Sequence, residues 1–342
     1  MEAVLSFERP QQIVKVSESS GISAARRSAS DIARAVGLNE TRIGEVALLV
    51  TEAATNIVKH ARDGEILIRP LMDRGNAGVE LIALDSGPGM ANLPRSMQDG
   101  VSTSGTYGIG LGAMQRNASD FDIYTAPGKG TAIFMTVRAG TDSGHTASIQ
   151  AGAVCQPIGG ETRNGDAWCI VIHPTSALLM MADGLGHGDE AADASDTAAQ
   201  FVKRYPGLAP TECLERIHGV LRSTRGAAVA VAYVDTMAEK VRFSGVGNIS
   251  ATILANDKRH QLVSHNGIVG SNVRKLQEFQ GEWSDTALLI MHSDGLGGRW
   301  DLSQYPGLSN CHPAVVAAVL YRDFRRGRDD VSVVVVRGYR SL

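Results

Sequence analysis

Apolar residues recur at helical spacing over residues 41–61. The positions that form one apolar face are Ile43, Val46, Val50, Ala53, Ile57 and Ala61. They predict an amphipathic helix. Short apolar runs over 66–69, 79–84 and 131–137 predict strands, with 72–78 as the connection between the first two. The order expected before residue 139 is strand, helix, helix, strand, strand, helix, strand, strand.

Strand-like patterns dominate the second half of the chain. The predicted strands cover 168–172, 177–181, 227–234, 241–244, 286–292 and 331–336. Helical stretches are expected at 189–205, 210–223 and 312–325. Because 333–336 is uniformly apolar, we expect its strand to lie in a covered sheet. Many strands with two or three long helices predict a layered α/β sandwich.

A small, polar stretch at 140–148 separates the two patterns, and we interpret it as a linker. The 342 residues are enough for two domains, each with its own core. We therefore expect domains at 1–139 and 149–342. With 43% hydrophobic and 20% charged residues, the chain should be globular. The expected fold class is an α/β (α+β) protein of two domains.

Composition and charge exclude several classes of protein. The net charge of −3 gives no electrostatic argument for binding nucleic acid or an anionic membrane. No apolar run approaches the ~20 residues of a membrane helix, and residues 1–12 hold no apolar signal core. The four cysteines are far apart and form no Cys-x-x-Cys pair. Buried or incidental thiols in a cytoplasmic protein are expected, rather than a zinc site or disulfides.

The amphipathic helix carries the first group of candidate site residues. Glu52 and Asn56 are four residues apart and share a helical face away from the apolar stripe. An asparagine oxygen can ligate Mg²⁺, and a nearby carboxylate can orient or deprotonate an attacking hydroxyl. Lys59, three residues further on, is placed to contact a phosphate.

Glycine-rich turns complete this group. Asp85 follows a strand, and Gly87 and Gly89 allow the close approach that would bring its carboxylate to an adenine amino group. A glycine loop can wrap phosphates, and the helix after it offers free N–H groups. The loop residues assigned to nucleotide binding are Gly108, Gly110, Leu111 and Gly112. Thr131, after the turn 128–130, begins the final strand of this part and is assigned with them.

Taken together and in this order, these motifs resemble the GHKL (Bergerat-fold) ATPases over about residues 12–138. They are most similar to the bacterial anti-sigma-factor serine/threonine kinases of the RsbT/RsbW type, and 97–105 resembles the stressosome switch kinases. The resemblance implies a Bergerat-type α/β sandwich that binds ATP with Mg²⁺. It implies Glu52 as the catalytic base, Asn56 as the Mg²⁺ ligand and Asp85 as the adenine contact. A histidine kinase is disfavoured, because the residues before the Glu52 helix contain no histidine.

Acidic residues stand at strand ends in the second half. Asp183-Gly184 and Asp294-Gly295 each end an apolar strand, Asp329 precedes the last strand, and Asp166 lies just before another. Such carboxylates can converge on Mg²⁺ or Mn²⁺. Two ions about 3.5–4 Å apart can activate a bridging water and neutralise a phosphate. The carbonyl of Gly184 is a further candidate ligand.

The motifs 165–168, 182–188, 245–248, 292–295 and 328–330 resemble the SpoIIE/RsbX branch of the PPM metal-dependent Ser/Thr phosphatases, over about 150–338. This implies a PPM-type α/β/β/α sandwich in which Asp183 bridges two metals and Asp294 and Asp329 bind one of them. Asp166 would act through water or hold a further metal, and Asp330 ranks below Asp329. Arg163, near the position where larger relatives bind phosphate, is left unassigned. For His187, an acid or phosphate contact and a packed turn residue remain equally open.

Both resemblances together imply a bifunctional regulator of a bacterial partner-switching or stressosome-type pathway. The first domain would phosphorylate a STAS-domain protein, and the second, with two or more Mn²⁺ or Mg²⁺ ions, would dephosphorylate it. The alternative is a phosphatase whose first domain is a non-catalytic ATP-sensing or partner-docking module. An inactive scaffold is disfavoured by the intact ligand set. Other partner-switching components and a homodimer are compatible with the resemblance, and the choice between Mg²⁺ and Mn²⁺ stays open.

Overall fold

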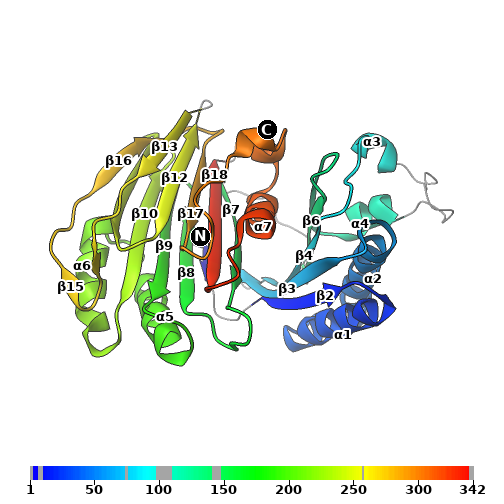
Figure 1. Cartoon of the computed structure of the whole chain (residues 1–342), viewed down its shortest axis with the longest axis horizontal. Helices are drawn as coiled ribbons and strands as arrows, with labels where there is room; N and C mark the ends of the chain where they lie inside the picture. Colours follow the sequence, from blue (N-terminus) through cyan, green and yellow to red (C-terminus); the bar gives the residue numbers. More distant parts are fainter. Residues whose placement is uncertain are drawn as a thin grey trace. The chain divides into compact units, whose positions relative to one another are not determined.

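The structure is a computed structural model that describes residues 3–6, 11–73, 76–97, 110–140, 148–255 and 258–338. The chain forms two compact units (Figure 1). The larger unit comprises Met1–Pro10, His145–Trp300 and Leu320–Leu342, and the smaller unit comprises Gln11–Gly144 and Asp301–Val319. The domain limits expected from the sequence, 139 and 149, stay predictions. No helix in the described ranges is long and apolar enough to cross a membrane.

An antiparallel sheet of five strands, counted over the described residues, forms the base of the smaller unit. Its order is β2 (Gln12–Val16), β3 (Gly64–Asp73), β4 (Asn76–Asp85), β6 (Thr131–Arg138) and β5 (Asp120–Thr125). Strands β3 and β4 pair through Asp73 and Asn76, so the connection predicted at 72–78 is wrong at both ends. The sequence 72–78 mixes polar residues with two glycines and has no alternating apolar pattern, so only the pairing of β3 with β4 reveals these strand ends.

Helices cover one face of this sheet. They are α1 (Ser19–Ala35), α2 (Glu40–Asn56) and α4 (Gly110–Asn117), whereas the short α3 (Leu93–Ser96) buries none of its residues. Helix α2 begins where the Asn39 side chain accepts a hydrogen bond from the Arg42 amide at 2.9 Å. Its predicted apolar face is confirmed, since Val46, Val50 and Ala53 are buried against the sheet. A π-helical turn, η1 (Ile57–Ala61), follows α2 directly.

The segment Asp301–Val319 groups with the smaller unit although it lies far along the chain. It contains two short 3₁₀ turns, η3 (Leu302–Gln304) and η4 (Leu308–Asn310). The His312 ring stacks on Phe134 of β6 at 4.1 Å between ring centroids. The Lys129 ammonium lies 4.5 Å from the ring centroid of Tyr305. These contacts join β6 and the turn before it to residues that local sequence patterns do not connect with them.

Two larger antiparallel sheets, counted over the described part of the chain, build the larger unit. The first runs β1 (Ala3–Ser6), β8 (Asp166–His173), β9 (Ser176–Gly184), β10 (Ala227–Asp235), β11 (Lys240–Val246) and β16 (Phe279–Glu282). The second runs β13 (Lys258–Leu262), β12 (Ser250–Ala255), β17 (Leu288–His292), β18 (Val331–Gly338) and β7 (Ile149–Gln156). A small pair, β14 (Gly267–Ile268) and β15 (Asn272–Val273), lies outside them.

Alternate residues of β8 enter two different cores. Trp168, Ile170 and Ile172 pack between the two large sheets. Cys169 and Val171 pack instead with residues of the helices α5 (Asp189–Arg204) and α6 (Pro210–Val220). Because side chains of a strand alternate between its faces, a strand covered on both sides reads as a continuous apolar run. The same holds for 333–336 of β18, whose predicted burial is confirmed.

The remaining predicted elements of the second half are confirmed within a few residues. Helix α6 continues into a 3₁₀ turn, η2 (Leu221–Ser223), and α7 spans Pro313–Phe324. In Figure 1, α5 and α6 lie beside strands β8 to β10. The burial of Cys169 and Cys213 raises the pKa of each thiol to about 12, which makes both chemically inert near neutral pH.

Candidate functional site

The first group of site residues gathers where α2 ends. Glu52 and Asn56 lie in its last turns, and Gly110, the first residue of α4, faces both. A Cβ added to Gly110 would lie 3.2 Å from Glu52 Oε2 and 3.7 Å from Asn56 Nδ2. The glycine thus lets backbone approach the two polar side chains closely. Lys59 is exposed on η1, and such π-helical turns occur frequently at functional sites.

Asp85 is held rigidly at the end of β4. Its Oδ1 accepts hydrogen bonds from the backbone N–H groups of Gly87, at 2.8 Å, and of Thr131, at 3.2 Å. Asp85 also pairs with Thr131 in the register of β4 and β6. A Cβ on Gly87 would meet Ala61 of η1 at 2.8 Å. The Asp85 turn and the end of the α2–η1 helix are therefore in direct contact.

The structure describes only the last part of the glycine loop. Gly108 lies outside the described residues. Leu111 and Gly112 follow Gly110 in the first turn of α4, where Gly112 is buried and Leu111 packs against the core of the smaller unit. Gly89 has φ +67°, and a Cβ there would lie 2.0 Å from the Ala126 carbonyl oxygen. The turn after Asp85 therefore requires glycine for steric reasons.

The second group forms an acidic cluster in the larger unit. Asp166 of β8 and Asp183 of β9 are direct cross-strand partners. Burial raises the pKa of Asp183 to about 7, helped by the charges of Asp294 and Asp329. Burial also raises the pKa of Asp166 well above its usual range, with a further contribution from Asp183. The charge of Asp183 therefore acts on Asp166, and the charges of Asp294 and Asp329 act on Asp183.

This cluster fits a divalent cation. Asp166 is 1% exposed, and its Oδ1 has no hydrogen-bond partner among the described residues. Within those residues, no group of three or more His, Cys, Asp or Glu side chains is placed so that it could hold a metal ion. Mg²⁺ usually keeps several waters and binds proteins through one or two carboxylates. A cluster of mutually repelling carboxylates that does not enclose an ion therefore suits a hard cation that keeps part of its water shell, rather than one bound by protein ligands alone.

Asn248 and Gly184 support the cluster. The Asn248 Nδ2 donates to Asp294 Oδ2 at 2.8 Å, which orients that carboxylate. Sequence reasoning placed Asn248 only within a family motif and gave it no role. The Gly184 amide donates to the Gly165 carbonyl at 2.9 Å, and an added Cβ would lie 2.1 Å from the Ala191 carbonyl oxygen. Glycine is thus required where β9 meets α5, and the Gly184 carbonyl as a metal ligand stays a prediction.

Asp330 holds the loop that precedes β8. Its Oδ1 accepts from the Ile158 amide at 2.7 Å, and its Oδ2 accepts from the Gly165 amide at 2.8 Å. Both oxygens are therefore engaged by backbone, whereas the neighbouring Asp329 is exposed and accepts one hydrogen bond from the Asp330 amide at 2.9 Å. This difference favours Asp329 over Asp330 as the ligand.

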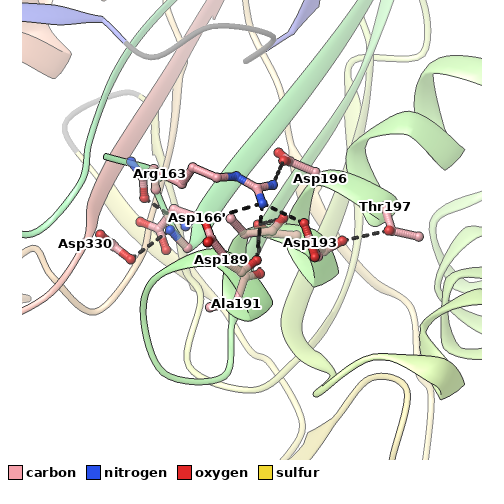
Figure 2. A network of polar contacts seen from close by, with 12 residues as sticks. Arg163, Asp166, Asp189, Ala191, Asp193, Asp196, Thr197 and Asp330 are labelled. Atoms are coloured by element: carbon pink, nitrogen blue, oxygen red, sulfur yellow. Dashed lines mark hydrogen bonds and ion pairs between the residues drawn. The ribbon is translucent and has the colours of Figure 1, made fainter. Parts of the chain in front are cut away.

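The Arg163 side chain is hydrogen-bonded to helix α5, as Figure 2 shows. Its guanidinium donates to Asp193 Oδ1 at 2.7 Å and to Asp196 Oδ2 at 2.8 Å. These hydrogen bonds raise the pKa of Arg163 further above its usual value. A phosphate would have to compete with both carboxylates for this side chain. His187 Nδ1 lies 2.8 Å from Glu161 Oε1, so the loop 157–165 is tied to the turn after β9 as well as to α5.

Comparisons with known proteins agree with this geometry. Residues 17–137 match the family described as histidine kinase-like ATPase domain, and residues 173–338 match stage II sporulation protein E (SpoIIE). The serine/threonine-protein kinase RsbT of Bacillus subtilis (strain 168) is 34% identical over 123 residues, which cover 36% of this chain and 92% of that protein. An anti-sigma F factor of Thermoanaerobacter sp. (strain X514) is 28% identical over 144 residues, or 40% of this chain and 99% of that protein.

A solved structure supports the same conclusion. It comes from work described as "The bacterial stressosome: a modular system that has been adapted to control secondary messenger signaling". It superposes with a TM-score of 0.52 and 28% identity, and the match covers 55% of this chain and 99% of that one.

The fold, the two polar clusters and these matches define a class of protein in which a histidine kinase-like ATPase domain is joined to a SpoIIE-type phosphatase domain. Through its first domain the chain belongs to the RsbT family of serine/threonine-protein kinases. The predicted GHKL and PPM resemblances, the mixed α/β two-domain fold and the assignment to enzymes of protein phosphorylation are confirmed. The combination of domains is that of partner-switching regulators.

Proposed function

We propose that this protein both phosphorylates and dephosphorylates a serine or threonine of a STAS-domain protein. The smaller unit transfers the γ-phosphoryl group of ATP, and the larger unit hydrolyses the resulting phosphoester. The observation that carries most weight is the cross-strand pair of the buried Asp166 and the half-buried Asp183, in which Asp166 Oδ1 lacks a hydrogen-bond partner among the described residues.

In the smaller unit, Glu52 orients or deprotonates the acceptor hydroxyl and Asn56 holds Mg²⁺. The approach of Gly110 to both side chains supports this, because it brings the described end of the glycine loop beside them. Lys59 contacts a phosphate, and Asp85 accepts from the adenine amino group. The hydrogen bonds from Gly87 and Thr131 to Asp85 Oδ1 support the last role, because they fix the carboxylate in one orientation.

In the larger unit, Asp183, Asp294 and Asp329 would hold Mn²⁺ or Mg²⁺ ions. When bound, such ions activate water and neutralise phosphate charge. Asp166 holds a further ion or its water, and Asn248 keeps Asp294 oriented. The mutual repulsion of these carboxylates supports the assignment, since a bound cation relieves it.

The relatives support the proposed partner. RsbT is a serine/threonine-protein kinase and the other relatives are anti-sigma F factors, which supports a STAS-domain partner and other partner-switching components. Because ATP is the phosphoryl donor, we place the activity in the cytoplasm. A homodimer fits the same class of kinases.

Label transfer from [γ-³²P]ATP to candidate STAS proteins tests the proposal. We expect Glu52→Gln to lose transfer while still binding ATP, and Asp294→Asn to keep transfer but fail to remove the label when Mn²⁺ is added. Glu45→Gln, two turns earlier on α2 and paired with Arg42, is the control and should transfer normally. If wild-type protein binds ATP and dephosphorylates the partner but never transfers label, the smaller unit is an ATP-sensing module and the kinase assignment fails.

A further inference from the structure

A buried chain of hydrogen bonds ends on Asp166. The Ser332 amide donates to Ser293 Oγ at 3.0 Å, and Ser293 Oγ donates to Asp166 Oδ2 at 2.6 Å. Ser293 and Ser332 are 0% exposed. Ser332 lies in β18 and Ser293 directly follows β17, both in one large sheet, whereas Asp166 lies in β8 of the other. This series of hydrogen bonds therefore connects the two large sheets at the acidic cluster.

The direction of these hydrogen bonds is settled by chemistry. A backbone N–H can only donate, so Ser293 Oγ accepts from Ser332. In the ionised form that a metal ligand requires, the Asp166 carboxylate can only accept, so the single hydroxyl proton of Ser293 points to Asp166 Oδ2. The Asp166 amide donates in turn to Asn164 Oδ1 at 2.8 Å, which fixes the backbone at the same residue. Asp166 is therefore constrained at its main chain and at one oxygen of its side chain.

The other oxygen of Asp166, Oδ1, does not take part in these hydrogen bonds. Oδ1 is buried and has no hydrogen-bond partner among the described residues. A buried carboxylate oxygen without a partner is strongly unfavourable unless a cation or a water held by one compensates it. The two oxygens thus differ sharply, since one is bound to a hydroxyl and the other is available.

Ser293 itself has no access to substrate. Its side chain is fully buried, and its hydroxyl is engaged both as donor and as acceptor. A nucleophilic role would require breaking both hydrogen bonds and exposing the residue. Its hydroxyl is therefore suited to holding a neighbour in place rather than to attacking a phosphoester.

We propose that Ser293 is a positioning residue for the metal centre: its hydroxyl occupies Asp166 Oδ2 and leaves Oδ1 as the one oxygen that Asp166 offers to a divalent cation or its water. The proposal rests on the proposed phosphatase function. Hydrogen bonds to metal-ligating groups typically contribute 10–100-fold to metal affinity or activity. The hydroxyl also stabilises the charged carboxylate in a buried setting.

The test is calorimetric titration of Mn²⁺ into the metal-stripped full-length protein. Ser293→Ala should weaken Mn²⁺ binding about 10-fold or more, and Ser293→Thr, which keeps the hydroxyl, should restore it to within about 3-fold of wild type. Ser244→Ala is the matched control, because Ser244 is also 0% exposed and donates to the Gln277 carbonyl at 3.1 Å. It should bind Mn²⁺ like wild type.

Ser293→Cys covers the case in which the alanine variant does not fold, since the thiol is close in size but a weak donor. It should weaken Mn²⁺ binding as well. Mn²⁺ affinity within about 2-fold of wild type in a folded alanine or cysteine variant would overturn the role of Ser293. An Asp183→Asn arm separates the two proposals. If it too binds Mn²⁺ normally, or if wild type binds none, the metal site itself is wrong and the inference falls with it.

Discussion

Replacing Asp183 by asparagine should stabilise the metal-free protein. In that state burial and the charges of Asp294 and Asp329 raise the Asp183 pKa from 3.8 to about 7. The folded protein then holds a proton that the unfolded chain releases, so the contribution of this carboxyl to stability falls as the pH rises from about 4 to about 7. It does not fall further once the pH exceeds the folded pKa.

The size of the effect follows from that shift. Each pKa unit corresponds to 1.36 kcal/mol, so a shift of about three units costs about 4 kcal/mol above pH 7. The nearby Asp166 shares part of the cost, which brings the expected value to about 2–4 kcal/mol. Asparagine is neutral at every pH. We therefore expect metal-free Asp183→Asn to be more stable than metal-free wild type by this amount at pH 8, and by only about 1 kcal/mol at pH 4.5.

Urea unfolding followed by tryptophan fluorescence measures this difference. The three tryptophans, Trp168, Trp283 and Trp300, all lie in the larger unit, so the signal reports that unit alone. Glu215→Gln, which removes an exposed carboxylate from α6, is the control and should change little at either pH. Added Mn²⁺ should stabilise wild type and leave Asp183→Asn unchanged. A metal-free Asp183→Asn protein that is less stable than wild type at pH 8 would refute the reasoning.

Two further predictions concern the smaller unit. Gly89→Ala should destabilise it by about 2 kcal/mol or more, because φ is +67° and the new methyl would lie 2.0 Å from a carbonyl oxygen. Gly128→Ala, at φ +72° with nothing within 4 Å, should cost only about 1 kcal/mol, and equal losses of melting temperature would contradict the steric argument. Asp85→Asn should weaken ATP binding about 10-fold or more and reduce the preference for ATP over GTP. Unchanged nucleotide preference would remove Asp85 from the adenine site.

The elements that the sequence predicts well are those whose pattern is set by burial. Strands β8, β9 and β18 are covered on both faces, so their apolar runs are unambiguous. Strand β13 was not predicted, because four of its five residues are exposed and its place in the sheet comes from pairing with β12. The short strand Ala3–Ser6 likewise depends on its partner β8. A strand that depends on pairing with another strand has no pattern in its own sequence from which it could be predicted.

The candidate site divides in a similar way. Strand-end acids such as Asp183 and Asp294 were located from their motifs, because the turn chemistry that places them is local. The roles of Asp330, Arg163 and Ser293 depend on hydrogen bonds to residues far away in sequence. No spacing rule connects Ser293 with Asp166, 127 positions apart. Register and tertiary packing decide which of several nearby polar residues faces the site.

The central proposal is that one protein both phosphorylates and dephosphorylates its partner. Its most direct test is a single reaction followed over time. Purified protein, a STAS-domain partner and [γ-³²P]ATP with Mg²⁺ are incubated, ATP is then removed, and Mn²⁺ is added. We predict that label first accumulates on one serine or threonine of the partner and then leaves that same residue as inorganic phosphate. Label that never appears on the partner, or that stays on it after Mn²⁺ is added to wild-type protein, would contradict the proposal.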